Sequence, residues 1–283
     1  MEYITYETMC RDIRQNLTKI PRDVCGVLGI PRSGMLPATI IAEHLNIGLC
    51  TLDAAMSMGV DAALRSHGGR SLRKTSSRRL LVVDDSCYYG NALTSVRDTL
   101  SHPAFSGYDI TVLVVYLEGP CTKERPDIWL RDIRSTAADG PFGWAIYEWN
   151  LFAHGRLTER TLFDLDGVIC VEPPDERHTD AYETYIAKPT PLHVPTAKKV
   201  SICTYRLMRY AGVTAKSLAD MGLPDVNLHM AADRSLPPAD FKAQVYRDDY
   251  WMLFVESSRR QATLLREYTR KPVICMETNE LIY

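Results

Sequence analysis

The chain has 283 residues, of which 46% are hydrophobic and 24% are charged, and its formal net charge is −2. A chain of this length favours two domains of about 100–200 residues each, and its near-neutral charge gives no reason to expect non-specific binding to nucleic acid or to a membrane surface. No apolar run approaches the roughly 20 residues that a membrane helix needs, and the first residues lack the basic region and apolar core of a signal peptide.

The chain opens with alternating helical and strand patterns. Apolar residues at roughly helical spacing predict a packing helix within residues 3–20, and residues 24–30 form an apolar run typical of a buried strand. The strand breaks into a turn at residues 31–34, helical spacing returns over 35–45, and a second short strand is expected at 47–52. A strand, a tight turn and a helix form a corner that can bind an anion, here with an arginine in the turn.

Residues 56–79 have a different character. They contain three glycines and six lysine or arginine residues, with little apolar patterning. We expect a mobile loop here, because long loops inside compact domains are usually either functional or disordered. Two interpretations stay open: a solvated basic surface loop, or a lid that closes over a negatively charged substrate.

The clearest chemical pattern lies at residues 80–93. Four apolar residues precede Asp84 and Asp85, and a short turn with one glycine then leads into a helix expected at 92–100. The apolar run is typical of a strand buried on both faces, and open α/β sheets bind ligands at the carboxyl ends of their strands. Two carboxylates beside a phosphate-binding turn make chemical sense if they hold ribose hydroxyls or a metal ion.

Another near-continuous apolar run predicts a strand at residues 110–117. Strands and helices therefore alternate in the way that is typical of a mostly parallel sheet. The following segment, residues 119–144, is rich in glycine, proline and aromatic residues and is expected to be irregular. Its aromatic side chains could stack on a planar ring or pack in the core, and both interpretations stay open.

These motifs resemble type I phosphoribosyltransferases, and the resemblance covers roughly residues 1–150. It implies that Asp84 and Asp85 hold the ribose of phosphoribosyl pyrophosphate (PRPP), that a base attacks C1 as pyrophosphate departs, and that Mg²⁺ bridges pyrophosphate and ribose oxygens. The 5′-phosphate turn departs from the family pattern, because Tyr89 precedes the glycine and Ala92 replaces a hydroxyl residue. The residues assigned to PRPP binding are Arg32, Ser33, Gly34, Asp84, Asp85, Ser86, Cys87, Tyr88, Tyr89, Gly90, Asn91 and Ala92.

The second half begins with a strand expected over residues 157–169, which contains Asp164 and Asp166. Two aspartates two positions apart at a strand end point the same way. A calcium loop would require further acids and a glutamate at set offsets, and the sequence does not supply them. The motif resembles the first motif of haloacid-dehalogenase-like (HAD) phosphatases. The resemblance implies that the first aspartate attacks phosphorus, that the second is the general acid/base, and that Mg²⁺ offsets the charge.

Later elements support this resemblance in the order that the HAD family has. Strands are expected at residues 199–204, 251–258 and 272–275, with a helix over 205–221. The segment before the first of these strands is too short for a large cap domain. The resemblance covers roughly residues 158–283. It assigns catalysis to Asp164, Asp166, Thr204 and Lys242, and the metal to Asp164, Asp166 and Glu256.

The sequence therefore predicts an α/β protein with two doubly wound, mostly parallel sheets: a phosphoribosyltransferase-like domain (1–155) and a HAD-like domain with a minimal cap (156–283). The expected function is bifunctional, with PRPP-dependent transfer and Mg²⁺-dependent hydrolysis of nucleotide-like 5′-phosphates, which together would make a nucleoside from a base. One alternative is a phosphatase whose first domain is a non-catalytic nucleotide or PRPP sensor. The other is a non-enzymatic scaffold.

Cysteine usage and charge predict the compartment and the partners. The eight cysteines are scattered without a Cys-x-x-Cys pair, and several lie in apolar runs. Buried free thiols in a reducing compartment are the favoured interpretation, so we expect a cytoplasmic protein without a zinc site or a disulfide framework. The expected partners are small molecules (PRPP, a base and a nucleotide) with Mg²⁺ as cofactor, and neither nucleic acid nor membrane. The oligomeric state is left open, with a homodimer as one candidate.

Overall fold

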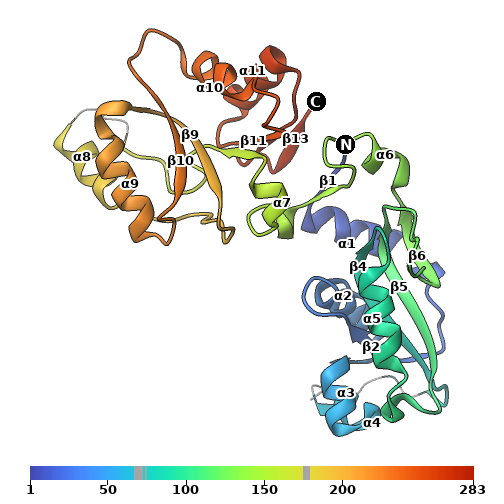
Figure 1. Ribbon diagram of the computed structural model, residues 1–283. Coiled ribbons are helices and arrows are strands. Elements are labelled where there is room, and N and C mark those ends of the chain that lie inside the picture. Colours follow the sequence, from blue (N-terminus) through green and yellow to red (C-terminus); the bar gives the residue numbers. More distant parts are fainter. Residues whose placement is uncertain (67–72, 74, 175–178) are drawn as a thin grey trace. The chain divides into compact units, whose positions relative to one another are not determined.

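A computed structural model describes residues 1–66, 73, 75–174 and 179–283 (Figure 1). The chain divides into two compact units, Met1–Ile146 (unit 1) and Tyr147–Tyr283 (unit 2), whereas the sequence-based division lies between residues 155 and 156. Each unit is built on a parallel or mostly parallel sheet, which confirms the predicted α/β class. No helix among the described residues combines the length and the apolar character needed to cross a membrane.

Unit 1 contains a five-stranded sheet in the order β3-β2-β4-β5-β6, and every neighbouring pair is parallel. The chain starts this sheet at β2, adds β3 on one side and then continues with β4 on the other. The strand order therefore reverses between β2 and β4, and ligands of open α/β sheets bind at such a switch point. The elements are β1 Tyr3–Ile4, α1 Tyr6–Gln15, the 3₁₀ helix η1 Leu17–Lys19, β2 Val24–Gly29, α2 Met35–Leu45, β3 Gly48–Thr51, α3 Leu52–Met58, α4 Val60–Ser66, β4 Arg79–Cys87, α5 Asn91–Leu100, η2 Pro103–Phe105, β5 Asp109–Leu117, β6 Ile128–Asp132, α6 Arg134–Ala138 and β7 Ile146–Tyr147.

The predicted loop over residues 56–79 is wrong for its first part. Helix α3 runs to Met58 and α4 covers the next residues, because Val60, Ala63 and Leu64 recur at helical spacing and pack into the unit 1 core. Residues 67–72 and 74 lie outside the described residues. The segment 119–144 is also more regular than expected, since it contains β6 and α6.

Unit 2 contains a six-stranded sheet in the order β10-β9-β8-β11-β12-β13. All neighbouring strands are parallel except β12 and β13, which pair antiparallel. The switch point of this sheet lies between β8 and β11. The elements are η3 Glu148–Asn150, α7 Gly155–Thr158, β8 Thr161–Phe163, α8 Asp180–Ala187, β9 Val200–Leu207, η4 Met208–Tyr210, α9 Ala211–Asp220, β10 Val226–Ala231, α10 Pro238–Tyr246, β11 Leu253–Glu256, α11 Arg259–Thr269, β12 Val273–Cys275 and β13 Glu280–Ile282.

Two predictions for unit 2 are wrong in extent. The strand expected over 157–169 is reduced to β8, because α7 precedes it and the chain turns back where the amides of Ile169 and Cys170 both donate to the Leu165 carbonyl. The helix expected over 205–221 begins only at Ala211, because β9 continues beside β10 as far as Leu207. Strand β10, helix α8 and the edge strand β13 were not expected from the sequence.

Candidate functional site

A buried ionic cluster lies at the switch point of the unit 2 sheet. Asp164 directly follows β8, and its amide donates to the Val255 carbonyl on β11 at 2.9 Å. Lys242 on α10 donates from Nζ to Asp164 Oδ2 at 2.8 Å and to Glu256 Oε2 at 2.7 Å. Asp164, Lys242 and Glu256 are 5%, 2% and 0% exposed. The structure thus brings together three residues from distant parts of the sequence, the first and last of which are 92 positions apart.

The electrostatics of this cluster follow from one ammonium group shared by two carboxylates. Burial and the neighbouring Glu256 raise the pKa of Asp164 well above its usual range, although Lys242 acts in the opposite direction. Burial alone would lower the pKa of Lys242, but Asp164 and Glu256 outweigh this effect and raise it. Lys242 is therefore a fixed positive charge between Asp164 and Glu256.

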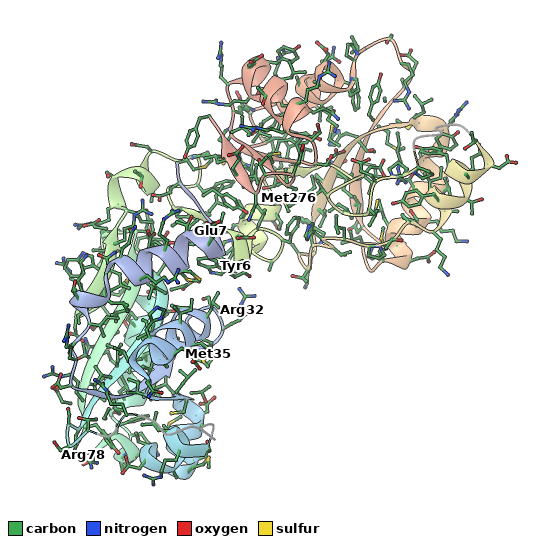
Figure 2. The ribbon with its side chains drawn as sticks, turned by 180° about the vertical axis from the view of Figure 1, so that it is seen from behind. Tyr6, Glu7, Arg32, Met35, Arg78 and Met276 are labelled. Carbon is green, nitrogen blue, oxygen red and sulfur yellow. The ribbon has the colours of Figure 1, made fainter. Side chains whose placement is uncertain are left out.

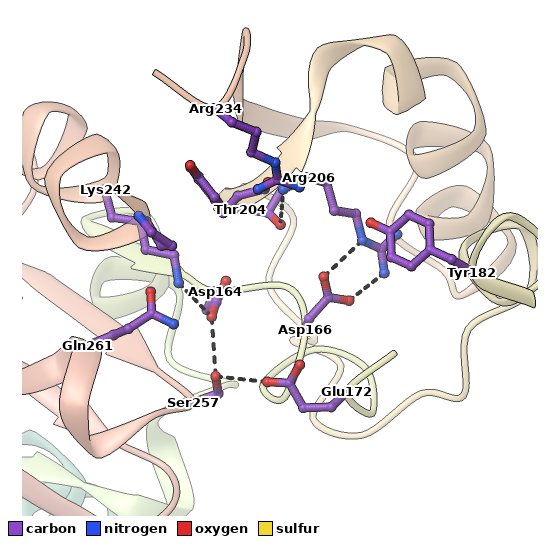
Figure 3. Close-up of a pocket in the computed structure, with 12 residues that line it drawn as sticks. Asp164, Asp166, Glu172, Tyr182, Thr204, Arg206, Arg234, Lys242, Ser257 and Gln261 are labelled. Carbon is purple, nitrogen blue, oxygen red and sulfur yellow. Dashed lines mark hydrogen bonds and ion pairs between the residues drawn. The ribbon is translucent and has the colours of Figure 1, made fainter. Parts of the chain in front are cut away.

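Asp164 also lines a pocket (Figure 3), whose wall contains Asp166, Thr204 and Lys242 from the predicted set. Among the described residues on this wall, Ser257 is present and Glu256 is not. Glu256 is instead held inside the protein, with Oε2 bonded to Lys242 and Oε1 accepting from the amides of Ser257 and Ser258.

Asp166 is engaged by a residue that sequence reasoning missed. The Arg206 guanidinium donates from Nε to Asp166 Oδ2 at 3.0 Å and from Nη2 to Oδ1 at 2.5 Å (Figure 3). Arg206 is only 2% exposed. It lies two positions beyond Thr204 on β9, and residues two apart on a strand face the same side. This spacing was the available signal, but it was obscured by the expectation of a helix from residue 205.

Hydroxyl groups complete the wall of the pocket. Thr204 is buried, and its Oγ1 accepts from the Arg206 amide at 3.2 Å. Ser257 Oγ lies 3.3 Å from Asp164 Oδ2 and 3.3 Å from Glu172 Oε1. Neither Ser257 nor Glu172 was assigned to the site from the sequence. Thr204 does not end its strand as expected, since β9 continues to Leu207.

The residues predicted to hold Mg²⁺ do not fit that ion in this arrangement. Among the described residues, no group of three or more histidine, cysteine, aspartate or glutamate side chains is placed to hold a metal. Mg²⁺ requires several oxygen ligands at 2.0–2.1 Å in octahedral geometry. Here both oxygens of Asp166 accept from Arg206, and Asp164 and Glu256 share Lys242. Mg²⁺ dependence therefore stays a prediction from the sequence resemblance.

The two phosphate-binding turns predicted for unit 1 lie side by side at its own switch point. A Cβ atom added to Gly34 would lie 2.6 Å from the Val83 carbonyl oxygen and 2.8 Å from Asp84 Oδ1, so only glycine allows this approach. The peptide bond between Pro31 and Arg32 is cis. Arg32 is exposed on this turn (Figure 2). Ser33 is half-buried.

The acidic pair of unit 1 lies within β4, which continues beyond it to Cys87. Asp84 and Asp85 are 6% and 5% exposed, and the Asp85 amide donates to Asp84 Oδ1 at 2.9 Å. Burial and the adjacent Asp85 raise the pKa of Asp84 well above its usual range. The Ser86 amide donates to Asp85 Oδ1 at 2.8 Å, so it is already engaged within the chain.

The residues that follow β4 form the turn into α5. Gly90 caps the helix with φ 86°, in the left-handed region that favours glycine. Tyr88 and Tyr89 stack edge to face with ring centroids 4.5 Å apart, and Tyr89 is 53% exposed. The other members of the predicted set differ in burial: Cys87 is buried, with its Sγ 3.0 Å from Cys121 Sγ, whereas Asn91 and Ala92 are exposed.

Replacing Gly90 with alanine should destabilise unit 1. The new Cβ would lie 1.9 Å from the Glu124 carbonyl oxygen and would also meet the left-handed backbone. Strain of this kind costs about 1–3 kcal/mol, measurable as a lower midpoint of urea unfolding. Gly107→Ala is the matched control, because φ is 83° there but the nearest atom, Arg78 Nε, is 3.9 Å away. Equal losses in the two variants would contradict the role of the close approach at Gly90.

Comparisons with known proteins find similarity in the first half of the chain. No family model and no curated protein matches. A purine phosphoribosyltransferase from Pyrococcus horikoshii is 15% identical with a TM-score of 0.35, over 52% of this chain and 92% of that one. A xanthine-guanine-hypoxanthine phosphoribosyltransferase from Helicobacter pylori is 16% identical with a TM-score of 0.35, over 52% and 94%. An orotate phosphoribosyltransferase from Aeropyrum pernix is 16% identical with a TM-score of 0.33, over 49% and 76%. Similarity this low carries no functional argument.

Proposed function

We propose that unit 2 hydrolyses phosphate monoesters with Asp164 as the nucleophile. One observation carries the proposal: the Asp164 carboxylate lies at the switch point of a parallel sheet, lines a pocket, and accepts a 2.8 Å hydrogen bond from a buried lysine. A carboxylate that is desolvated and faces a fixed cation is suited to attack phosphorus, because the cation also stabilises charge on the transferring group.

The reaction then proceeds in two displacements. An Asp164 oxygen forms a bond to phosphorus while the bond to the leaving alcohol breaks, and water next cleaves the aspartyl phosphate. Lys242 and the hydroxyls of Thr204 and Ser257 can donate to the phosphoryl oxygens, and Asp166 can exchange protons with the leaving oxygen and with water. The sequence resemblance adds Mg²⁺ as a charge-neutralising cofactor, and no step of this proposal depends on it.

The direct test is release of inorganic phosphate from nucleoside 5′-monophosphates and other phosphate monoesters by the full chain. We expect turnover of at least one nucleotide-like substrate. The proposal would be wrong if no phosphate monoester were hydrolysed, either with Mg²⁺ or with a chelator, by protein that is folded by circular dichroism.

A second candidate function concerns unit 1, where we propose a PRPP site. The observation that favours it is the contact between the two turns, in which Gly34 approaches Asp84 and allows one ligand to meet both. Asp84 and Asp85 would bind the ribose hydroxyls, and Arg32 and Ser33 would bind the pyrophosphate. If unit 1 also transfers the phosphoribosyl group, unit 2 could remove the 5′-phosphate of its product. PRPP binding without turnover would favour the alternative in which unit 1 is a non-catalytic PRPP sensor. Absence of binding and of turnover in both units would favour the non-enzymatic scaffold.

Replacing Asp84 with asparagine should weaken PRPP binding and yet stabilise unit 1. The folded-state pKa of Asp84 is raised by burial and by Asp85, so its ionised form costs stability that grows as pH rises from the unfolded pKa to the folded pKa. At pH 7 the neutral amide removes that cost. We expect weaker PRPP binding by calorimetry together with a higher midpoint of urea unfolding. The exposed Asp98→Asn is the control, and a stabilised variant that still binds PRPP normally would contradict the ligand role.

A further inference from the structure

Arg206 is the most unusual side chain of the pocket in unit 2, because a nearly fully buried cation lines a site where the sequence predicts a metal. Its guanidinium donates two hydrogen bonds to Asp166, one to each carboxylate oxygen (Figure 3). This bidentate geometry is rigid and stays charged at any physiological pH, because arginine does not lose its proton in proteins. Asp166 therefore carries its own counter-cation within the chain.

The remaining nitrogen of Arg206 lacks an acceptor. Within the described parts of the chain, Nη1 is buried and makes no hydrogen bond. A buried donor without a partner costs about 1–3 kcal/mol, and more when it is charged. Arg206 is also part of the pocket wall, so the charge of its guanidinium acts on an anionic ligand that enters the pocket.

The other cations of the pocket are placed to bind the same anion. Lys242 lies at Asp164, and Arg234 stacks on the Tyr205 ring, with its guanidinium carbon 4.1 Å from the ring centroid and Nη1 donating to the Tyr205 carbonyl at 2.8 Å. The wall has three cations, Arg206, Arg234 and Lys242, and three carboxylates, Asp164, Asp166 and Glu172, while Glu256 behind it shares Lys242 with Asp164. The cations of the chain therefore offset most of the negative charge at this site before any ion enters.

We propose that Arg206 replaces the divalent cation at this site, and that the pocket binds the dianionic phosphoryl group of a phosphate monoester without a metal. The inference rests on the proposed phosphomonoesterase and concerns how that same site holds its substrate. A Mg²⁺ ion beside Asp166 would have to share the carboxylate with a guanidinium and would be repelled by it. Without Arg206 the wall would carry excess negative charge, and the phosphoryl group would then require an added cation.

The test is calorimetric titration of the full chain with inorganic phosphate, once in EDTA and once with Mg²⁺. We expect binding in EDTA, with a Kd that Mg²⁺ changes by less than about threefold. In Arg206→Met, the loss of the guanidinium charge should weaken binding in EDTA by at least about tenfold, and Mg²⁺ should tighten it again. A purely structural role for Arg206 would not create this new metal dependence.

Two further variants keep the test decisive if Arg206→Met fails to fold. The double variant Arg206→Met/Asp166→Asn removes both charges and avoids a buried unpaired carboxylate. Arg206→Lys keeps the positive charge but cannot make the two parallel hydrogen bonds to Asp166. Both should bind phosphate less tightly than the native chain in EDTA. Arg209→Met is the control, because Arg209 is exposed and stacks on Tyr210, and it should bind as the native chain does.

Three results would overturn the inference: phosphate binding by the native chain only when Mg²⁺ is present, no phosphate binding in either buffer, or unchanged binding by folded Arg206 variants. The two proposals can fail separately. Hydrolysis that strictly requires Mg²⁺ would refute metal-free binding and leave the phosphomonoesterase standing. Phosphate binding in EDTA that depends on Arg206, without hydrolysis of any monoester, would refute the phosphomonoesterase and support metal-free binding.

Discussion

Asp164→Asn should abolish phosphate release, with a loss in kcat of at least about a thousandfold, the scale expected when a nucleophile is removed. The amide keeps the shape of the side chain, which follows β8 and accepts from Lys242 at 2.8 Å, but an amide oxygen is a far weaker nucleophile. The measurement is the steady-state rate of inorganic phosphate release from the best nucleotide substrate. Rapid mixing would also show that the variant forms no aspartyl phosphate.

The control for this variant is Asp220→Asn, an exposed aspartate at the end of α9, which should leave the rate unchanged. Circular dichroism must show that Asp164→Asn is folded, because the substitution also alters a buried ion pair. A folded variant that keeps more than about a tenth of the native rate would remove Asp164 from the chemistry, since loss of a nucleophile costs far more than tenfold.

Lys242→Met should produce the largest loss of stability. The ammonium is 2% exposed and is bonded to two carboxylates that are themselves buried. Removing one partner of a buried ion pair typically costs about 3–5 kcal/mol, because the remaining charge is left without compensation. Here two carboxylates lose their cation at once. We expect a lower midpoint of urea unfolding for unit 2, followed by circular dichroism, with loss of phosphatase activity even where the variant is folded.

A second substitution distinguishes charge from packing in this experiment. Adding Glu256→Gln to Lys242→Met removes one of the two carboxylates that are left without a cation. The loss of unfolding free energy in the double variant should therefore be smaller than the sum of the losses in the two single variants. Lys216→Met changes an exposed lysine on α9 and should have almost no effect. If the two single losses simply added, charge compensation would not be the origin of the stability.

The sequence predicted the positions of residues that depend on a single strand and its end. Asp164, Glu256 and Asp84 each lie at or near the carboxyl end of an apolar strand, and parallel strands bring such ends to one edge of a sheet. The register of β8 and β11 then brought Asp164 beside Glu256, and the turn that follows β2 brought Gly34 close to Asp84. These contacts follow from topology, so the order of the motifs along the chain was sufficient to expect them.

Side-chain pairs that depend on where an element ends could not be predicted. Arg206 shares a face with Thr204 only because β9 continues to Leu207, and pairing with β10, a strand that the sequence did not indicate, keeps β9 extended. In the same way, Val60, Ala63 and Leu64 form helix α4 because they reach the core, although the basic residues and glycines around them favour a loop. Tertiary packing decided both cases.

Each unit contains its own sheet, its own switch point and its own set of candidate residues. Three hydrophobic clusters of described residues follow the same division, since one around Leu80 and Val112 lies in unit 1 and those around Phe254 and Tyr182 lie in unit 2. In evolutionary terms, each described site could therefore acquire substitutions without changing a residue of the other.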